Sequence, residues 1–401
     1  MESTRPFEDG ARVLHIGPPK TATSSLQGAF HGSRERLSPY GVTYAGRVRH
    51  PREAATFAAL GKVPVENDER SVAAWEALAS EMRGSTDRIV VASSEAFSMA
   101  SEATIAQIVE KLGGRAEVVL TVRPLGRMLA SCWQQRVQNG ETRDYDAWLA
   151  HVFQRDDERA LLARRFWDRY GIDRLARRWA SVVGAEHVTV VVLDPTDRSM
   201  LLRSFDDLLD VPRGTLVADE ETANESLPYP EVEMLRQFSL RFHAQGGTRA
   251  EWINVVRCSA LAAVRTSSEP LFEAQPIPTP RWAVEAANEA CEGWGAFLGG
   301  WPGRVVGDTA HLLVDASRFP QETRAPSTVS TRSAGIVADL MYRAARDHYS
   351  GVSHRARRAA EIERARARAA RRAEAAAAAA AAAQRRRFPA RVRAAARALL
   401  R

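Results

Sequence analysis

The residues best suited to chemistry stand together near the amino end, in the stretch RVLHIGPPKTATSSLQ at positions 12–27. An apolar run ends at Gly17 and is followed by two prolines, Lys20 and a hydroxyl-rich turn, Thr21 to Ser25, that opens a helical pattern. A helix N-terminus presents free N–H groups and a positive dipole end, to which hydroxyls and an ammonium add donors and charge. The stretch predicts a phosphate-binding loop. The alternative, a solvated surface lysine, is weakened because only three of the 56 basic residues are lysines.

Two common nucleotide-binding patterns are missing from this loop. The Walker pattern GxxxxGK[ST] does not occur, because Lys20 stands near the start of the loop and no second glycine precedes it. The dinucleotide pattern GxGxxG does not follow the strand either. A nucleotide-dependent kinase is therefore disfavoured, since it would need a Walker-like loop and a carboxylate for Mg²⁺.

A second pair of residues suited to phosphate follows a later strand. Arg123 ends the run Glu117–Arg123, and Ser131 lies eight residues further on, in the next helical pattern. A forked guanidinium and a hydroxyl from these positions can converge on one phosphate. The alternatives are an ion pair for Arg123 and an ordinary helix position for Ser131. Two phosphate sites after neighbouring strands suit one nucleotide with two separate phosphate groups.

These two segments together resemble a known family. PKTATSS at positions 19–25 is similar to the 5′-phosphosulfate loop of sulfotransferases that use 3′-phosphoadenosine-5′-phosphosulfate (PAPS), commonly PKTGTTS. Arg123 and Ser131 match the family's 3′-phosphate motif, Arg-x7-Ser. The resemblance runs from about position 12 to position 312 and is specific in these two motifs. Ala22 stands where glycine is commoner, which matters only if that residue takes a positive φ.

The resemblance implies a role for each residue of these motifs. Lys20 would stabilise charge on the leaving oxygen during sulfuryl transfer. The 3′-phosphate would be held by Arg123 and Ser131. The 5′-phosphate would be held by the loop, at Lys20, Thr21, Ala22, Thr23, Ser24 and Ser25. Trp133 could stack on adenine, although an aromatic residue at this point of a helix is commonly part of the core. No metal is required, and the sequence contains no obvious metal-ligand cluster.

The general base has two candidates. Glu95 follows the run Arg88–Ser93, at the strand end where open α/β sheets bind ligands, and family members place a catalytic His or Glu after the corresponding strand. We therefore predict Glu95 as the base. His50, before Pro51, is the second candidate. Glu95 could instead cap a helix or pair with an arginine, and His50 could be an ordinary loop histidine.

The elements that must position these residues are predicted from hydrophobic patterning. Near-continuous apolar runs predict parallel strands covered by helices on both faces, at Arg12–Gly17, Arg88–Ser93, Glu117–Arg123 and His187–Leu193. With the resemblance, we predict an α/β, three-layer, P-loop-like fold with a central, mostly parallel sheet flanked by helices. Further helices are expected at Ser204–Leu209, Pro230–Phe242 and Trp282–Leu298, with a loop at Pro276–Pro280 and a linker or long loop at Pro320–Ser333.

Charge is distributed unevenly over the 401 residues. The net charge is +7, but residues 351–401 hold fifteen arginines against three glutamates, so the rest of the chain is acidic. The basic character therefore belongs to residues 351–401, and it does not indicate that the rest of the chain binds nucleic acid specifically. We expect a sulfotransferase-like domain at 1–320, a linker and terminal helix at 321–350, and an Ala/Arg-rich tail at 351–401. The tail is either solvated helix or disorder, or a basic amphipathic helix that makes peripheral contact with anionic lipid.

These observations lead to a functional prediction. Three cysteines without paired spacing and a polar start without a leader pattern indicate a cytoplasmic protein, located at the inner membrane surface if the tail binds lipid. The expected activity is sulfuryl transfer from PAPS to a hydroxyl or amine of a small-molecule or glycan acceptor: a carbohydrate, lipid or secondary metabolite. Acceptor-binding walls are expected from Arg47–Ala79, Thr142–Arg169 and the helices after Asp194. The alternative is a non-catalytic nucleotide-fold protein that uses its tail for membrane or partner binding.

Overall fold

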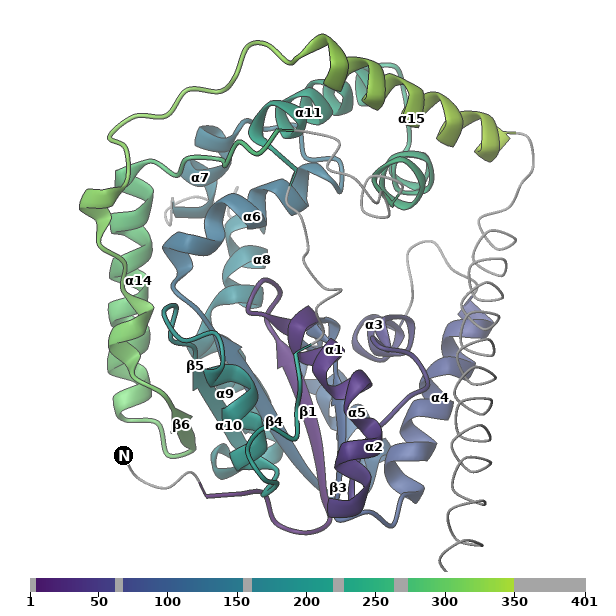
Figure 1. The fold of residues 1–401 in the computed structure, drawn as a ribbon, viewed down its shortest axis with the longest axis vertical. Helices are drawn as coiled ribbons and strands as arrows, with labels where there is room; N and C mark the ends of the chain where they lie inside the picture. Colours follow the sequence, from purple (N-terminus) through teal and green to yellow (C-terminus); the bar gives the residue numbers. More distant parts are fainter. Residues whose placement is uncertain (1–4, 62–67, 154–160, 219–226, 263–272, 350–401) are drawn as a thin grey trace, which may run out of the picture.

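A central parallel sheet organises the protein. The computed structural model describes residues 5–61, 68–153, 161–218, 227–262 and 273–349 (Figure 1). Within them, six strands pair in parallel in the order β2-β3-β1-β4-β5-β6. Their bounds are Ala11–Gly17 (β1), Val42–Tyr44 (β2), Ile89–Ser93 (β3), Arg115–Val122 (β4), Val188–Val192 (β5) and Arg304–Val306 (β6). The predicted α/β class with a parallel sheet is confirmed, and the four predicted strands match β1, β3, β4 and β5 to within two residues.

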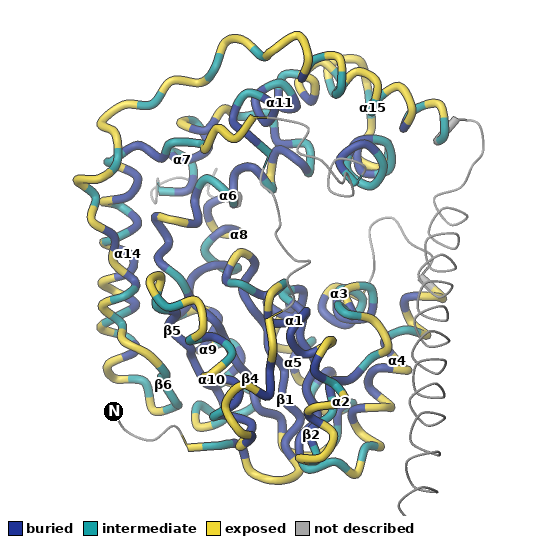
Figure 2. Tube along the Cα trace, viewed as in Figure 1, coloured by how far each residue is buried: buried dark blue, intermediate teal, exposed yellow. Residues whose placement is uncertain are grey.

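Helices cover both faces of the sheet because its strands are apolar on both sides. In β1, Ala11 and Val13 belong to one buried cluster and Leu14 and Ile16 to another, as the alternation of side chains along a strand requires. The first cluster includes residues of α1 (Thr23–Gly32), α2 (Arg34–Leu37) and α10 (Met200–Leu208). The second includes residues of α4 (Asp68–Gly84), α5 (Glu102–Leu112) and α9 (Ile172–Val183). Figure 2 shows the central strands as the most buried part of the chain. The result is a three-layer α/β arrangement.

Two further helices pack beside the sheet, α3 (Arg52–Leu60) and α14 (Arg281–Gly299). A short 3-10 helix at Glu95–Met99 follows β3 directly.

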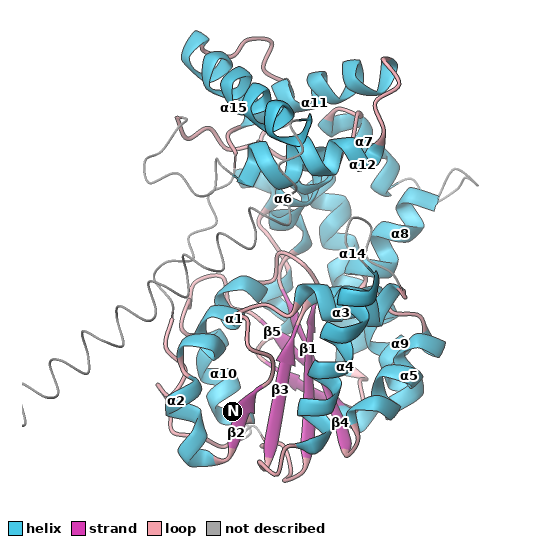
Figure 3. Cartoon of the chain, turned by 90° about the vertical axis from the view of Figure 1, so that its right-hand side faces the viewer, coloured by secondary structure: helices cyan, strands magenta, loops and turns pink. Residues whose placement is uncertain are grey.

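A second group of helices lies beyond the carboxyl ends of the strands (Figures 1 and 3). It contains α6 (Leu125–Val137), α7 (Tyr145–Phe153), α8 (Leu161–Tyr170), α11 (Tyr229–Ala244), α12 (Arg249–Glu251), the π-helix Trp252–Ala260 and α15 (Thr331–Tyr349). The candidate site residues follow the carboxyl ends of β1, β3 and β4, so they lie between the sheet and this group of helices.

Several expectations from the sequence differ from the structure. The strands β2 and β6 are three residues long, too short to produce a recognisable apolar run, and both were missed. The helices predicted after position 200 are present as α10, α11 and α14, and residues 273–280 have no regular secondary structure, as expected for the loop at Pro276–Pro280. The helix α15 begins at Thr331, inside the predicted linker, and packs against the π-helix.

The predicted tail at 351–401 and its lipid contact lie outside the described residues. Among the residues that are described, no helix has both the length and the apolar character needed to cross a bilayer.

Candidate active site

The predicted phosphate loop connects β1 to α1. Gly17, Lys20 and Ala22 all have positive φ, at 82°, 72° and 65°. Ala22 is the N-cap residue of α1, where no side chain caps the helix and no acidic residue occupies the first turn. The first helical hydrogen bond runs from the Leu26 N–H to the Ala22 carbonyl, so the three N–H groups before it have no helical acceptor. The turn has the open, electropositive geometry of an anion site.

Whether Ala22 takes a positive φ, which the sequence left open, is decided by its backbone conformation. At φ 65° and ψ 22° this residue lies in the left-handed region, where an L side chain is strained and glycine is not. Alanine instead of glycine therefore has a cost at this position. Of the hydroxyl residues in the loop, Thr21 and Thr23 are buried, Ser24 is half-buried and Ser25 is exposed.

A buried network holds the loop on the sheet. The Thr21 hydroxyl donates to the Pro18 carbonyl (2.6 Å) and lies 2.9 Å from the Thr121 hydroxyl of β4. Thr121 also contacts His15 Nε2 (3.0 Å), and His15 Nδ1 lies 2.7 Å from the Ser93 hydroxyl of β3. Burial lowers the pKa of His15 to about 3, against the opposing charge of Glu95. The neutral ring therefore links three strands beneath the loop. The sequence did not single out this network, because Thr121 and Ser93 stand in otherwise apolar runs.

The two candidate bases lie together next to the loop. His50 Nε2 is 3.4 Å from Glu95 Oε2 and 2.9 Å from the Ser94 hydroxyl. A Cβ on Gly17 would stand 3.0 Å from the Glu95 Cβ, so Glu95 closely approaches the end of β1. Gln27 of α1 donates weakly to the same carboxylate oxygen (3.4 Å). About a fifth to a quarter of each side chain of the pair is exposed, at 22% for Glu95 and 24% for His50.

The electrostatics of this pair favour a neutral imidazole beside a carboxylate. Burial lowers the pKa of His50, although Glu95 opposes the shift. For Glu95, burial alone would raise the pKa, but His50, a backbone hydrogen bond and the charges of Arg52 and Arg169 outweigh it, and the net shift is downward. Near neutral pH, both groups are therefore able to accept a proton.

Arg123 brings the second predicted phosphate site to the loop. It follows the last residue of β4, and its Nη1 donates to the Lys20 carbonyl at 3.4 Å. Burial lowers its pKa, and the neighbouring charge of Arg127 lowers it further. Arg123 and Arg127 line a cavity of about 400 Å³ between α6 and two loops, at 277–279 and 319–320. The pair of arginines makes this cavity electropositive, and Arg127 was not among the residues singled out from the sequence.

Two other predicted nucleotide contacts have different surroundings. The Ser131 hydroxyl donates to the Met128 carbonyl of its own helix (2.9 Å), and Ser131 does not line the cavity beside Arg123. Trp133 is completely buried, its Nε1 donates to the Arg143 carbonyl, and its ring packs on Tyr145 and Tyr229. The indole therefore belongs to the core and offers no face to adenine, as the sequence alternative allowed.

Neither a cluster of metal-ligating side chains nor a disulfide is found among the described residues. Within the described part of the chain, no three His, Cys, Asp or Glu side chains gather closely enough to hold a metal ion. Cys132, Cys258 and Cys291 are unpaired, and the first and third are buried.

The chain is similar in structure to two sulfotransferases, at low sequence identity. No protein-family model and no curated protein sequence matches the chain. Among solved structures, a sulfotransferase from Alicyclobacillus acidocaldarius is similar, with 19% identity, a TM-score of 0.35, and coverage of 62% of this chain and 95% of the other. The sulfotransferase domain from the curacin biosynthetic pathway is also similar, with 13% identity, a TM-score of 0.29, and coverage of 61% and 99%.

Proposed function

We propose that this protein is a PAPS-dependent sulfotransferase that transfers a sulfuryl group to an acceptor hydroxyl or amine. The observation that carries the proposal is the contact between the two predicted phosphate sites, in which Arg123 reaches the carbonyl of Lys20. Residues about a hundred positions apart thus form one electropositive region around an uncapped helix N-terminus. A candidate base lies beside the same loop, which a non-catalytic nucleotide-binding protein would not require.

The residues present fit the donor nucleotide. When bound, PAPS supplies an activated sulfuryl group on a phosphate oxygen. The uncapped N–H groups of Thr23, Ser24 and Ser25 would hold the 5′-phosphate, and Arg123 would bind the 3′-phosphate with support from Arg127. The exposed ammonium of Lys20 would stabilise negative charge on the leaving oxygen.

Glu95 remains the proposed base, with His50 as the alternative. The two groups act on each other directly, so the proton of the acceptor would be taken by a coupled pair rather than by an isolated carboxylate. Glu95 is favoured by its position at the end of β3 and its close approach to Gly17. His50 is favoured by its neutral imidazole, which can accept a proton and lies within 3.4 Å of the Glu95 carboxylate.

The test of the donor site is calorimetric titration with 3′-phosphoadenosine-5′-phosphate, the desulfated product, in parallel with ATP. Wild-type protein should bind the bisphosphate with little affinity for ATP, and Arg123→Ala should weaken that binding by about tenfold or more, because a charge-assisted contact is lost. Arg115→Ala is the matched control, since Arg115 lies at the opposite end of the same strand. Absence of bisphosphate binding to the wild type would overturn the proposal and favour the non-catalytic alternative.

A further inference from the structure

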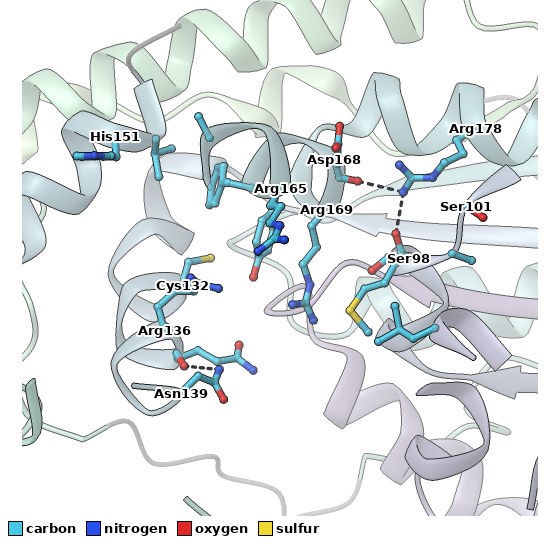
Figure 4. Close-up of a pocket in the computed structure, with 18 of the residues that line it drawn as sticks. Ser98, Ser101, Cys132, Arg136, Asn139, His151, Arg165, Asp168, Arg169 and Arg178 are labelled. Atoms are coloured by element: carbon cyan, nitrogen blue, oxygen red, sulfur yellow. Dashed lines mark hydrogen bonds between the residues drawn. The ribbon is translucent and has the colours of Figure 1, made fainter. Parts of the chain in front are cut away.

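A large cavity adjoins the candidate catalytic groups. It has a volume of about 790 Å³ and lies between the 3-10 helix after β3 and helices α6, α7 and α8 (Figure 4). Ser98, whose hydroxyl donates to the Glu95 carbonyl (2.6 Å), forms part of its wall. Cys132 also lines it. Burial raises the pKa of this thiol to about 11, and the charges of Lys20 and Arg169 oppose the shift. Ser98 and Met99 of the wall belong to the 3-10 helix that begins at Glu95, so a molecule in this cavity would lie next to that helix.

The wall of the cavity carries an excess of positive charge. Five arginines line it against two acidic residues, Glu102 and Asp168. The Asp168 carboxylate lies 2.9 Å from Nη1 of Arg174, and Arg174 is not one of the residues that line the cavity. Internal contacts account for only part of the arginine charge. The arginines are Arg136, Arg143, Arg165, Arg169 and Arg178.

Three of these arginines have internal partners. Arg143 makes a bidentate pair with Glu141 (2.9 and 2.8 Å), and Arg136 reaches the same carboxylate at 3.6 Å. Arg178 donates to the backbone carbonyls of Ser98 and Asp168 at 2.7 and 3.0 Å. The single carboxylate of Glu141 therefore cannot neutralise both Arg136 and Arg143. The backbone carbonyls that bind Arg178 carry no net charge, so the positive charge of Arg178 is not neutralised.

The two remaining arginines lie on α8 and extend into the cavity (Figure 4). Within the described residues, neither Arg165 nor Arg169 makes a hydrogen bond or a close ion pair, although the charge of Arg169 acts on Glu95. The Nε atom of Arg169 is buried without a partner. A partly buried guanidinium without an anionic partner is costly, and an anion bound to its terminal nitrogens would offset part of that cost. The opposite wall is apolar, with Trp148, Val152 and Phe166.

We propose that this cavity binds the acceptor and that it selects acceptors carrying an anionic group, a carboxylate or an ester of phosphate or sulfate, on a partly apolar body. Arg165 and Arg169 would bind the anionic group through bidentate hydrogen bonds. The apolar wall would cover the body, and the acceptor hydroxyl would lie toward Glu95. The inference rests on the proposed sulfotransferase function.

The test compares acceptor analogues that differ only in charge. The probes are 4-hydroxyphenylacetate with its amide, 12-hydroxydodecanoate with its amide, and 4-nitrophenyl glucuronide with the corresponding glucoside. They are titrated against wild-type protein and against Arg165→Gln and Arg169→Gln. In at least one pair, the anionic member should bind about tenfold more tightly to the wild type, and either substitution should remove most of that advantage.

The matched control is Arg164→Gln, because Arg164 lies on the same helix with 76% of its side chain exposed and pairs with Asp168. It should retain the preference for the anionic member. Equal binding, or no binding, of both members in all three pairs would overturn the inference. Titration of each variant with the bisphosphate nucleotide separates the two proposals: a wild type that binds neither nucleotide nor probe contradicts both, whereas nucleotide binding without charge selectivity contradicts only this one. If Arg169→Gln does not fold, the exposed Arg165 still provides the test.

Discussion

At the scale of single residues, the phosphate loop contains backbone strain. Lys20 and Ala22 both lie in the left-handed region, which costs an L residue about 1–2 kcal/mol. Such strain persists where surrounding contacts fix the conformation, and it is concentrated at functional sites. Thr21, between the two residues, is buried and hydrogen-bonded to Pro18, which holds the turn in place. The strained turn leaves the first N–H groups of α1 without a side-chain cap.

Ala22→Gly should therefore stabilise the protein. Removing the Cβ relieves the left-handed strain, and part of the gain is offset by the greater backbone entropy of glycine in the unfolded chain, so the free energy of unfolding should rise by about 0.5–1 kcal/mol. Denaturant titration measures the change. Ala106→Gly, at an exposed position inside α5, is the matched control and should lower the same quantity by about 1 kcal/mol. A loss of stability in Ala22→Gly would contradict the assigned strain.

At the scale of elements, the polar contacts of His15 bind β1 to its two neighbours and, through Thr121, to the loop. Strand pairing alone would align β1, β3 and β4, but it would not fix the turn that follows β1. The network does so from beneath, and its neutral histidine makes the sheet sensitive to acid. Ordinary strand patterning predicted β1, β3 and β4 correctly. It gave no sign of the network, because a single polar residue in an apolar run identifies no partner.

Acid should destabilise the protein through His15. Above pH 6.5 the histidine is neutral in both the native and the unfolded chain. Below that pH this histidine binds a proton in the unfolded chain, whereas in the native state it stays neutral down to about pH 3. The free energy of unfolding therefore falls as the pH falls. From pH 7 to pH 5 this residue alone should lower the free energy of unfolding by about 2 kcal/mol.

The measurement is denaturant unfolding at a series of pH values. In His15→Asn, the part of the dependence of the free energy of unfolding on pH that comes from this residue should disappear. The variant should also be less stable at every pH, because two hydrogen bonds are lost. Ala106→Gly, which lowers stability without removing a titratable group, should keep the wild-type slope. An unchanged slope in His15→Asn would show that the buried ring does not titrate as inferred.

At the scale of the whole molecule, the candidate site is assembled from segments far apart in the chain. The Glu95–His50 pair joins the end of β3 to the segment before α3, and Arg123 meets Lys20 from the end of β4. The helices beyond the sheet add the arginine-lined cavity. Parallel strands place all their carboxyl ends at one edge, which explains why these residues converge.

Glu95→Gln tests the chemistry of this assembly. If the carboxylate is the base, turnover should fall by about 100-fold or more, while affinity for the bisphosphate nucleotide stays close to that of the wild type. Steady-state kinetics with a responsive acceptor and nucleotide titration provide the two readouts. A normal turnover number would assign the role to His50 instead, in which case His50→Gln should show the loss.

Continuous apolar runs, prolines and hydroxyl residues act locally, so sequence patterns were enough to predict the α/β class, four central strands and the strand–loop–helix at Lys20. They also brought out Arg123, Glu95 and His50 as candidates. Tertiary structure alone decided that Glu95 and His50 are in contact, that Trp133 is buried in the core, and that Arg165 and Arg169 enter a cavity. Contacts between distant segments depend on how helices pack over the sheet, and no local pattern in one sequence records that packing.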